Sequence, residues 1–340
     1  MIADLHIGVK HGDDIWFASQ RKFYTDQLVP ELTVKGITEL WILGDVFDSR
    51  PSITILTINR VIDLFKNVLK DFKIRIIVGN HDMFYNSDLK VNSLRILELI
   101  PNVTVYDEQV ADEIDGKKIL FLPWITDYKK EDLITGTYDY CFAHADIIGF
   151  DCGGGRPSDS GLQASYLLDH FNTVYSGHYH SRTTRHYEED KSISYLGAPY
   201  QLTRIDRDGI RGYDILDIGT GEKEFVENKV SIKFTKHTYP NANMDIVPGN
   251  VVDMDIPYEF RNDTRRITDY ITRLEELHPA YPVNINYLSN TEDTETTIDT
   301  TDLNLIKMVT EYLEQYETAV NKDKIFAKFS DLYNLYKDQA

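Results

Sequence analysis

Short apolar runs in the first two thirds of the chain end at a glycine, and an aspartate, asparagine or histidine follows almost at once. The clearest examples are the run 40–43, which precedes Asp45, and the run 74–78, which precedes Asn80. Between them, residues 53–71 carry apolar side chains at helical spacing, so this segment predicts a strand, a helix and a second strand. Repetition of the pattern up to about residue 217 is typical of a layered α/β domain.

In open α/β sheets, ligands bind where strands end and loops begin, so the polar residues after these runs are expected to share one site. Further strands are predicted at 103–106, 118–122, 140–143 and 173–175. The predicted fold class is therefore α/β. We expect a layered sandwich of sheets flanked by helices, with a small α+β cap and a helical C-terminal tail.

After residue 217 the alternation of apolar runs and helical patterns gives way to turn-forming and linker-like segments, which predicts that the chain has several units. We expect a main domain over 1–218 and a capping domain over 219–288, the latter with a strand at 251–256, a helix over 262–277 and a strand at 283–287. A Thr-, Asp- and Glu-rich stretch over 289–302 predicts a flexible tether. Apolar residues at helical spacing predict two amphipathic helices within 303–340.

The charge balance restricts what the protein can bind. Lys and Arg total 36 against 55 for Asp and Glu, a formal net charge of −19, which repels nucleic acids and anionic membranes at long range. A substrate that carries phosphate therefore needs a local source of positive charge. No apolar run approaches the roughly 18 residues of a membrane span, and the N-terminus has no basic and apolar signal segment. With only 2 cysteines, the chain is expected to be cytoplasmic, in a bacterium or a phage-infected host.

Five groups of residues with metal-binding side chains follow the apolar runs. On an extended segment, residues two apart point the same way, as a chelating pair requires. Imidazole, carboxylate and amide ligands without thiolate suit Mn²⁺, Fe²⁺, Zn²⁺ or Mg²⁺, and two such ions about 3.5–4 Å apart form a clamp for phosphoryl transfer. Two divalent ions also supply the positive charge that the rest of the chain lacks. The groups are Asp4-x-His6, Gly44-Asp45-x-x-Asp48, Gly79-Asn80-His81-Asp82, His144 and Gly177-His178-x-His180.

Each group alone has an ordinary structural explanation. An Asp-x-His pair is commonly a solvated surface pair, Gly-Asp-x-x-Asp is a frequent strand-to-helix turn, and Asn-His-Asp fits a helix cap. The five groups in this order, each after an apolar run, favour one metal centre over five unrelated features.

The set resembles the signature of the calcineurin-like metallophosphoesterases, which is D-x-H, GD-x-x-D, GNH-D/E, H and GH-x-H in that order. The closer likeness is to the SbcD-type DNA-repair nucleases, a family that includes a phage recombination-nuclease subunit. The residues that carry this likeness are the opening Asp4-Leu5-His6-Ile7-Gly8, the segment Leu122-Pro123-Trp124, and Tyr195-Leu196-Gly197-Ala198-Pro199-Tyr200.

The resemblance implies a site of two divalent ions, with Mn²⁺ as the expected metal, and a role for each residue. One ion would be held by Asp4, His6, Asp45 and His180, and the other by Asp45, Asn80, His144 and His178, with Asp45 as the bridge. His81 matches the catalytic histidine of the family, which lies near the scissile phosphate and binds no metal. Asp82 is expected to orient His81 or to cap a following helix, and Asp48 receives no ligand role.

The resemblance also implies a function, a Mn²⁺-dependent DNA exonuclease and endonuclease subunit that acts at DNA ends in recombination and double-strand-break repair. Its expected partners are DNA, a coiled-coil ABC-type ATPase subunit (SbcC-like) that binds the 303–340 tail, and a second copy of the chain. Two alternatives remain open: a phosphodiesterase for small nucleotides and a non-catalytic DNA-repair adaptor.

The N-terminus departs from the family pattern. Relatives have an apolar strand of several residues before Asp-x-His, whereas here only residues 1–3 precede Asp4. We therefore expect either a start placed too late or a truncated chain. If the chain begins at Met1, we expect a weakly anchored first metal site.

Overall fold

The computed structural model describes residues 1–127, 133–289, 322 and 324–329. It divides into two units, Met1–Leu288 and Ser289–Ala340. In the second unit, residues 322 and 324–329 are helical, and the rest of the predicted tether and tail lies outside the described residues. Within the described part of the chain, no helix is both long and apolar enough to cross a membrane.

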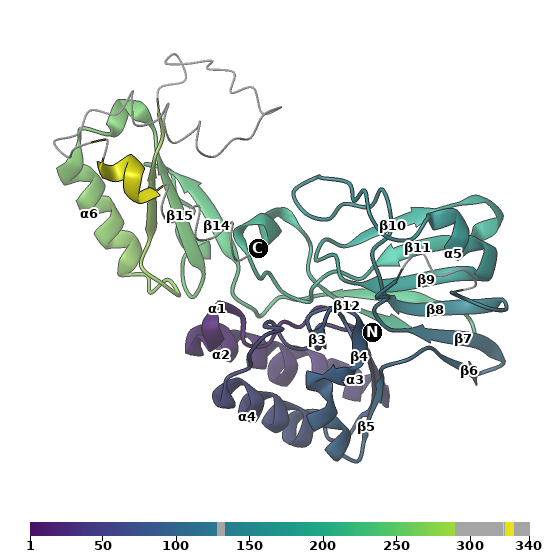
Figure 1. Ribbon diagram of the computed structural model, residues 1–340. Coiled ribbons are helices and arrows are strands. Elements are labelled where there is room, and N and C mark those ends of the chain that lie inside the picture. The colour runs from purple at the N-terminus through teal and green to yellow at the C-terminus, as the bar shows by residue number, and fades with distance from the viewer. Residues whose placement is uncertain (128–132, 290–321, 323, 330–340) are drawn as a thin grey trace. The chain divides into compact units, whose positions relative to one another are not determined.

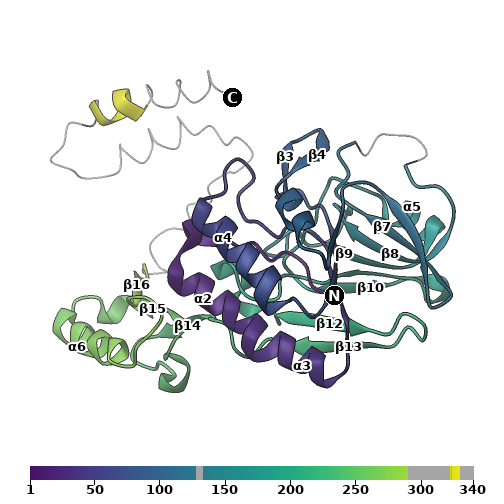
Figure 2. The same ribbon diagram turned by 90° about the horizontal axis from the view of Figure 1, so that it is seen from below.

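The first sheet of the large unit has three parallel strands in the order β1-β2-β5, namely β1 (Glu39–Ile42), β2 (Lys73–Ile77) and β5 (Val103–Tyr106). Residues 2–7 run parallel to β1 and continue past its end through backbone hydrogen bonds, the first from Ile2 N to the Trp41 carbonyl at 2.9 Å. The helices on this side lie together over one face of the sheet (Figure 1), and Figure 2 shows the same grouping from below. They are α2 (Asp14–Lys22), the π-helical turn η1 (Phe23–Leu28), α3 (Val29–Val34), α4 (Ile55–Asp63) and the π-helical turn η2 (Leu64–Val68), preceded by the short turn α1 (Val9–Gly12).

The second sheet has six strands in the order β10-β11-β9-β8-β7-β6. Its inner strands are parallel, and β6 and β10 close its edges in antiparallel orientation. Helix α5 (Ala164–His170) packs on its outer face. The strands are β6 (Val110–Ile114), β7 (Lys117–Leu122), β8 (Tyr138–His144), β9 (Phe171–Gly177), β10 (Thr183–His186) and β11 (Ser192–Tyr195).

Aromatic side chains join the two sheets face to face. The Trp41 ring of β1 packs edge-on against Phe142 of β8 and Phe121 of β7, with centroid distances of 4.6 and 5.1 Å. Edge-to-face pairs at this spacing add to the free energy gained by burying the rings. This packing fixes one sheet against the other and confirms the predicted layered α/β sandwich.

A smaller sheet of three parallel strands, in the order β14-β15-β16, forms the capping unit with helix α6 (Thr264–Glu275). Its strands are β14 (Phe234–Thr238), β15 (Val251–Ile256) and β16 (Asn284–Tyr287). Apolar side chains of β15 and α6 form a separate core, whereas Phe234 of β14 packs with Trp16 of α2. The boundary expected at 218/219 needs correction, because it falls inside a hairpin of β12 (Gly212–Leu216) and β13 (Lys223–Glu227). Val226 of β13 packs on the core of the first sheet, and the separate core of the cap begins at Tyr239, just after β14.

The remaining elements are short. A hairpin of β3 (Met83–Tyr85) and β4 (Asp88–Asn92) follows β2. The 3₁₀ turns are η3 (Ser93–Leu99), η4 (Glu188–Asp190), η5 (Arg204–Asp208), η6 (Met244–Ile246) and η7 (Tyr258–Phe260).

Candidate metal centre

The five predicted groups meet at the ends of four strands. Asp45 follows β1, Asn80 and His81 follow β2, His144 ends β8, and His178 and His180 follow β9, while Asp4 and His6 lie in the segment beside β1. A contact between a side chain and the backbone joins the two sheets here, since Nδ1 of the His144 ring lies 2.7 Å from the carbonyl oxygen of Leu43. The structure thus brings residues from 4 to 180 into one cluster of side chains.

The first group of ligand-type atoms comes from Asp4, His6 and His180. These atoms lie within 4.8 Å of one another, and His6 Nε2 is 3.0 Å from His180 Nε2. Asp4 Oδ1 accepts the backbone N–H of His178, whereas its buried Oδ2 has no hydrogen-bond partner among the described residues. A buried carboxylate oxygen without a donor costs free energy unless a cation satisfies it.

The second group comes from Asp45, His144 and His178, and Asn80 lies among them. Asn80 Oδ1 is 3.0 Å from His144 Nε2 and 2.9 Å from His178 Nδ1. Asp45 Oδ2 lies 3.4 Å from His144 Nε2 and 3.7 Å from His6 Nε2, so this carboxylate stands between the two groups. That is the position a bridging ligand requires.

Two ligands, Asp45 and Asn80, each follow a glycine whose Cα lies too close to neighbouring atoms to carry a side chain. A Cβ on Gly44 would meet His144 Nδ1 at 2.3 Å, and a Cβ on Gly79 would meet Asp45 Oδ1 at 2.2 Å. Asp4, His6 and Asp45 themselves adopt left-handed backbone conformations, with φ of 55, 42 and 54°. Such conformations cost roughly 1–3 kcal/mol each and concentrate at functional sites.

Electrostatics in the cluster depend on compensation between carboxylates and imidazoles. Burial lowers the pKa of His144, but the Asp45 carboxylate overrides burial and raises that pKa to about 9. Burial acts in the opposite sense on Asp45, yet the neighbouring histidines hold the pKa of Asp45 well below its usual range. For His180, burial and the nearby His6 both lower the pKa. Positive charge on protonated histidine thus compensates the negative charge of the buried carboxylates. When the histidines are deprotonated and bind divalent cations, the cations supply that positive charge instead.

His81 lies beside the first group, and hydrogen bonds to Asp45 and Asp48 hold it there. Its backbone N–H donates to Asp45 Oδ1 at 2.8 Å, and its Nδ1 contacts the Asp48 carbonyl at 2.6 Å, which leaves Nε2 available for another partner. The side chains of His6, Asp45 and His81 also form a group of ligand-type atoms within 4.8 Å, so His81 is close enough to reach the same centre. The Asp48 carboxylate lies 3.3 Å from His6 Nδ1.

The expectation for Asp82 was wrong. Its buried carboxylate neither contacts His81 nor caps a helix, and it holds the two motif loops together. Oδ2 accepts the N–H groups of Gly79 and Asp45 at 3.0 and 2.8 Å, and Oδ1 accepts those of Val46 and Phe47 at 3.0 and 3.1 Å.

The expectation of a weakly anchored N-terminal segment was also wrong. Asp4 and His6 are buried, and their N–H groups donate to the carbonyls of Gly44 and Asp45. The carbonyl of Leu5 accepts hydrogen bonds from the Gln20 amide and the Tyr200 hydroxyl at 3.1 and 2.6 Å.

Sequence reasoning missed Asp146, which orients a predicted ligand. Its Oδ1 lies 3.1 Å from His178 Nε2 and accepts the Tyr179 hydroxyl at 2.6 Å. Because the Asp146 carboxylate accepts the Nε2–H and so fixes the tautomer, Nδ1 is left with its lone pair directed toward Asn80 Oδ1, as a metal ligand requires. Asp146 stands two residues after His144, and that spacing was the available signal. Trp124, which the resemblance had quoted, packs on the His178 ring at 4.8 Å.

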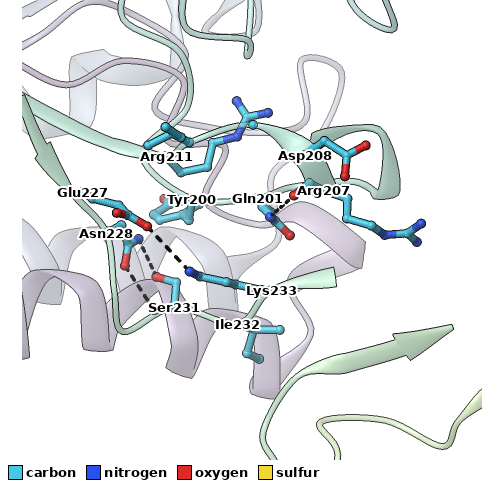
Figure 3. A pocket seen from close by; sticks show the side chains of 12 residues that line it. Tyr200, Gln201, Arg207, Asp208, Arg211, Glu227, Asn228, Ser231, Ile232 and Lys233 are labelled. Atoms are coloured by element: carbon cyan, nitrogen blue, oxygen red, sulfur yellow. Dashed lines mark hydrogen bonds and ion pairs between the residues drawn. The ribbon is translucent and has the colours of Figure 1, made fainter. Parts of the chain in front are cut away.

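A cavity of about 330 Å³ borders the cluster at Asp48 and is lined by Lys10, His11, Ser49 and Ser52 among others. A smaller cavity of about 150 Å³ is lined by residues of η5, the end of β13 and the segment before β14, and none of the predicted site residues lines it (Figure 3).

No model of a known protein family matches the chain. Over 237 residues it is 31% identical to exonuclease subunit 1 of Enterobacteria phage T4, an alignment that covers 68% of this chain and 67% of the phage T4 protein. The chain belongs to the SbcD-type phage recombination nuclease subunits. The resemblance indicated by the motifs is thereby confirmed, and the cluster described above is the candidate active site of a member of this family.

Proposed function

We propose that this protein is the nuclease subunit of a recombination and repair complex, and that it hydrolyses phosphodiester bonds at DNA ends in the cytoplasm of a bacterial or phage-infected host. The observation that carries the proposal is the convergence of Asp4, His6, Asp45, Asn80, His144, His178 and His180 in one cluster whose two later histidines are partly exposed. Kinship with a phage exonuclease subunit supports the choice of DNA as substrate.

The donor set fits two divalent ions. The oxygen Asp4 Oδ2 is buried without a hydrogen-bond donor among the described residues. Atoms with lone pairs also lie close together: His6 Nε2 is 3.0 Å from His180 Nε2, and Asn80 Oδ1 is 2.9–3.0 Å from a ring nitrogen of His144 and of His178. We assign Asp4, His6, Asp45 and His180 to one ion and Asp45, Asn80, His144 and His178 to the other, with Mn²⁺ as the preferred metal. Two bound ions would polarise the scissile phosphodiester and lower the pKa of the attacking water.

The other residues position and assist. Asp146 holds the His178 ring through its Nε2, and the Leu43 carbonyl holds the His144 ring through its Nδ1, so the opposite nitrogen of each ring is directed to the centre. We assign His81 the catalytic role of stabilising the transition state or assisting the departing oxygen from Nε2, because its Nδ1 is already held by the Asp48 carbonyl.

The proposal includes two protein partners. A second copy of the chain is expected to pack on α2 and α4, where Ile15, Ile55 and Leu56 are exposed. The second is a coiled-coil ABC-type ATPase subunit, which the apolar stripes of the 303–340 tail are proposed to bind as helices in a groove. The word "subunit" in the name of the phage T4 relative is consistent with an assembly.

A nuclease assay tests the proposal directly. The full chain is incubated with end-labelled duplex and hairpin DNA in Mn²⁺, Mg²⁺ or EDTA, and bis-p-nitrophenyl phosphate serves as a small substrate. We expect shortening of DNA in Mn²⁺ that EDTA abolishes. Hydrolysis of the small ester without cleavage of DNA would instead support a phosphodiesterase for small nucleotides, and no hydrolysis of either would support a non-catalytic adaptor.

A further inference from the structure

The β3–β4 hairpin, visible at the upper part of Figure 2, begins two residues after His81 and carries two adjacent exposed aromatic side chains. Phe84 is 52% exposed and Tyr85 is 53% exposed, although burial of either ring would stabilise the fold. Single exposed apolar residues are common on protein surfaces, but an adjacent pair beside an active site needs a reason.

The backbone of the hairpin brings these two rings together. Consecutive side chains of a regular strand point to opposite faces. Here the pairing with β4 is irregular between Met83 and Tyr85, and the rings of Phe84 and Tyr85 meet edge-to-face at a centroid distance of 4.8 Å. Bulges of this kind re-aim side chains and are frequent beside active sites.

The hairpin is fixed to the metal-binding loop at its base. Met83 is buried, and the Asp82 carbonyl accepts hydrogen bonds from the N–H and the hydroxyl of Ser93 just beyond β4. Three Cα–Cα steps separate Phe84 from His81, so their Cα atoms are at most about 11 Å apart. This places the aromatic pair within reach of a nucleotide adjacent to the scissile phosphate.

Arg50 supplies positive charge at the same place. Its Nε donates to the Asn80 carbonyl at 2.8 Å, and its Nη1 donates to the Asn86 side chain at the tip of the hairpin. Both acceptors are neutral, and none of the ion pairs among the described residues includes Arg50. By contrast, Lys90 on β4 is paired with Asp107 and Glu108. The charge of Arg50 is therefore free to contact a phosphate in a chain whose net charge is −19.

We infer that the β3–β4 hairpin is a nucleotide-binding site in which Phe84 and Tyr85 stack on an unpaired base at the DNA end while Arg50 contacts the neighbouring phosphate. Aromatic side chains with a nearby cation are the usual means of holding single-stranded nucleic acid without sequence preference. The inference rests on the proposed function and deepens it, because it makes a frayed or single-stranded end the form of DNA that enters the site.

Binding without catalysis tests the inference separately from the nuclease assay. Full-length protein is titrated in EDTA with a fluorescent single strand whose terminal nucleotide is either intact or abasic. We expect Phe84→Ala combined with Tyr85→Ala to weaken binding of the intact strand roughly 5- to 100-fold. The abasic terminus should weaken binding of the wild type similarly and add little to the double variant. Leu99→Ala, which removes an exposed apolar side chain outside the hairpin, is the matched control.

Two further variants separate stacking from other roles. Phe84→Leu keeps an apolar surface but loses the aromatic ring, so this variant should bind DNA weakly. If it binds DNA with wild-type affinity, the hairpin is an apolar protein-docking patch and the inference is overturned. Arg50→Gln should lower the slope of log affinity against log salt concentration by about 0.7, the value of one phosphate contact on a single strand. Additive effects of the double variant and the abasic terminus would also overturn it. Failure of the wild type to cleave DNA in Mn²⁺ would count against the proposed function alone, because this titration contains no metal.

Discussion

Asp82 offers the sharpest test of how the active site is held together. Its two carboxylate oxygens accept four backbone N–H groups from the loops after β1 and β2. In Asp82→Asn, an amide NH₂ replaces one oxygen and faces two N–H donors, so two hydrogen bonds are lost. Hydrogen bonds to a charged group contribute about 1.5–3 kcal/mol each, which predicts a loss of about 3–6 kcal/mol.

Two effects oppose this loss. Burial of the Asp82 carboxylate and, after it, the like charge of Asp45 raise the pKa of Asp82 to about 7, so neutralising Asp82 relieves both penalties and favours the lower end of the range. Even about 3 kcal/mol is a large fraction of the roughly 5–15 kcal/mol by which native proteins are stable. For a unit of this size we expect Tm to fall by roughly 5 to 20 °C.

Thermal unfolding in EDTA measures this change without a contribution from bound metal. Asp159→Asn removes the charge of an exposed aspartate and should leave Tm within about 2 °C of the wild type. Mn²⁺ binding at a temperature where Asp82→Asn is still folded should also be weaker, because the loops that carry Asp45 and Asn80 are no longer tied together. If Asp82→Asn unfolds at the same temperature as Asp159→Asn, the four hydrogen bonds do not stabilise the site as we have reasoned.

The remaining predictions concern the metals, the chemistry and the tail. Asp45→Asn should reduce bound Mn²⁺ toward zero per chain, whereas one ion retained with unchanged affinity would exclude a bridging role. His81→Asn should keep both ions, and its single-turnover cleavage rate should fall about 100-fold or more. Asn80→Ala should lose bound metal, and excess Mn²⁺ should restore part of its cleavage rate. If excess Mn²⁺ also restores the cleavage rate of His81→Asn, His81 is a ligand. Asp146→Asn should weaken Mn²⁺ binding about 10- to 100-fold with little change in Tm, and unchanged affinity would show that His178 needs no orienting carboxylate. Deletion of 303–340 should leave phosphodiesterase activity on short substrates and abolish co-purification with the ATPase subunit, a result that retained binding would contradict.

Local sequence patterns were sufficient for the central strands. The runs predicted at 40–43 and 74–78 correspond to β1 and β2 within one residue at each end, because parallel strands inside a sheet read as nearly continuous apolar runs. The run predicted at 103–106 coincides with the edge strand β5, which its β-branched and aromatic residues favour. Strand β14 was missed, since Phe234–Thr238 holds one apolar residue followed by four polar ones, including Lys236 and His237. Its place in the cap depends on pairing with β15, which local pattern does not encode.

The sequence by itself determined which residue types follow each strand and in what order, because glycine, carboxylate and imidazole at strand ends are local properties of the chain. Only the tertiary structure decided how these residues meet. His6 and His180 are 174 residues apart, yet their Nε2 atoms are 3.0 Å apart, a contact that requires the two sheets to pack through Trp41 and Phe142. The same holds for Asp82 and Asp146, whose roles arise from contacts that join separate loops. No pattern along the chain specifies such contacts, because their geometry exists only after both sheets have packed.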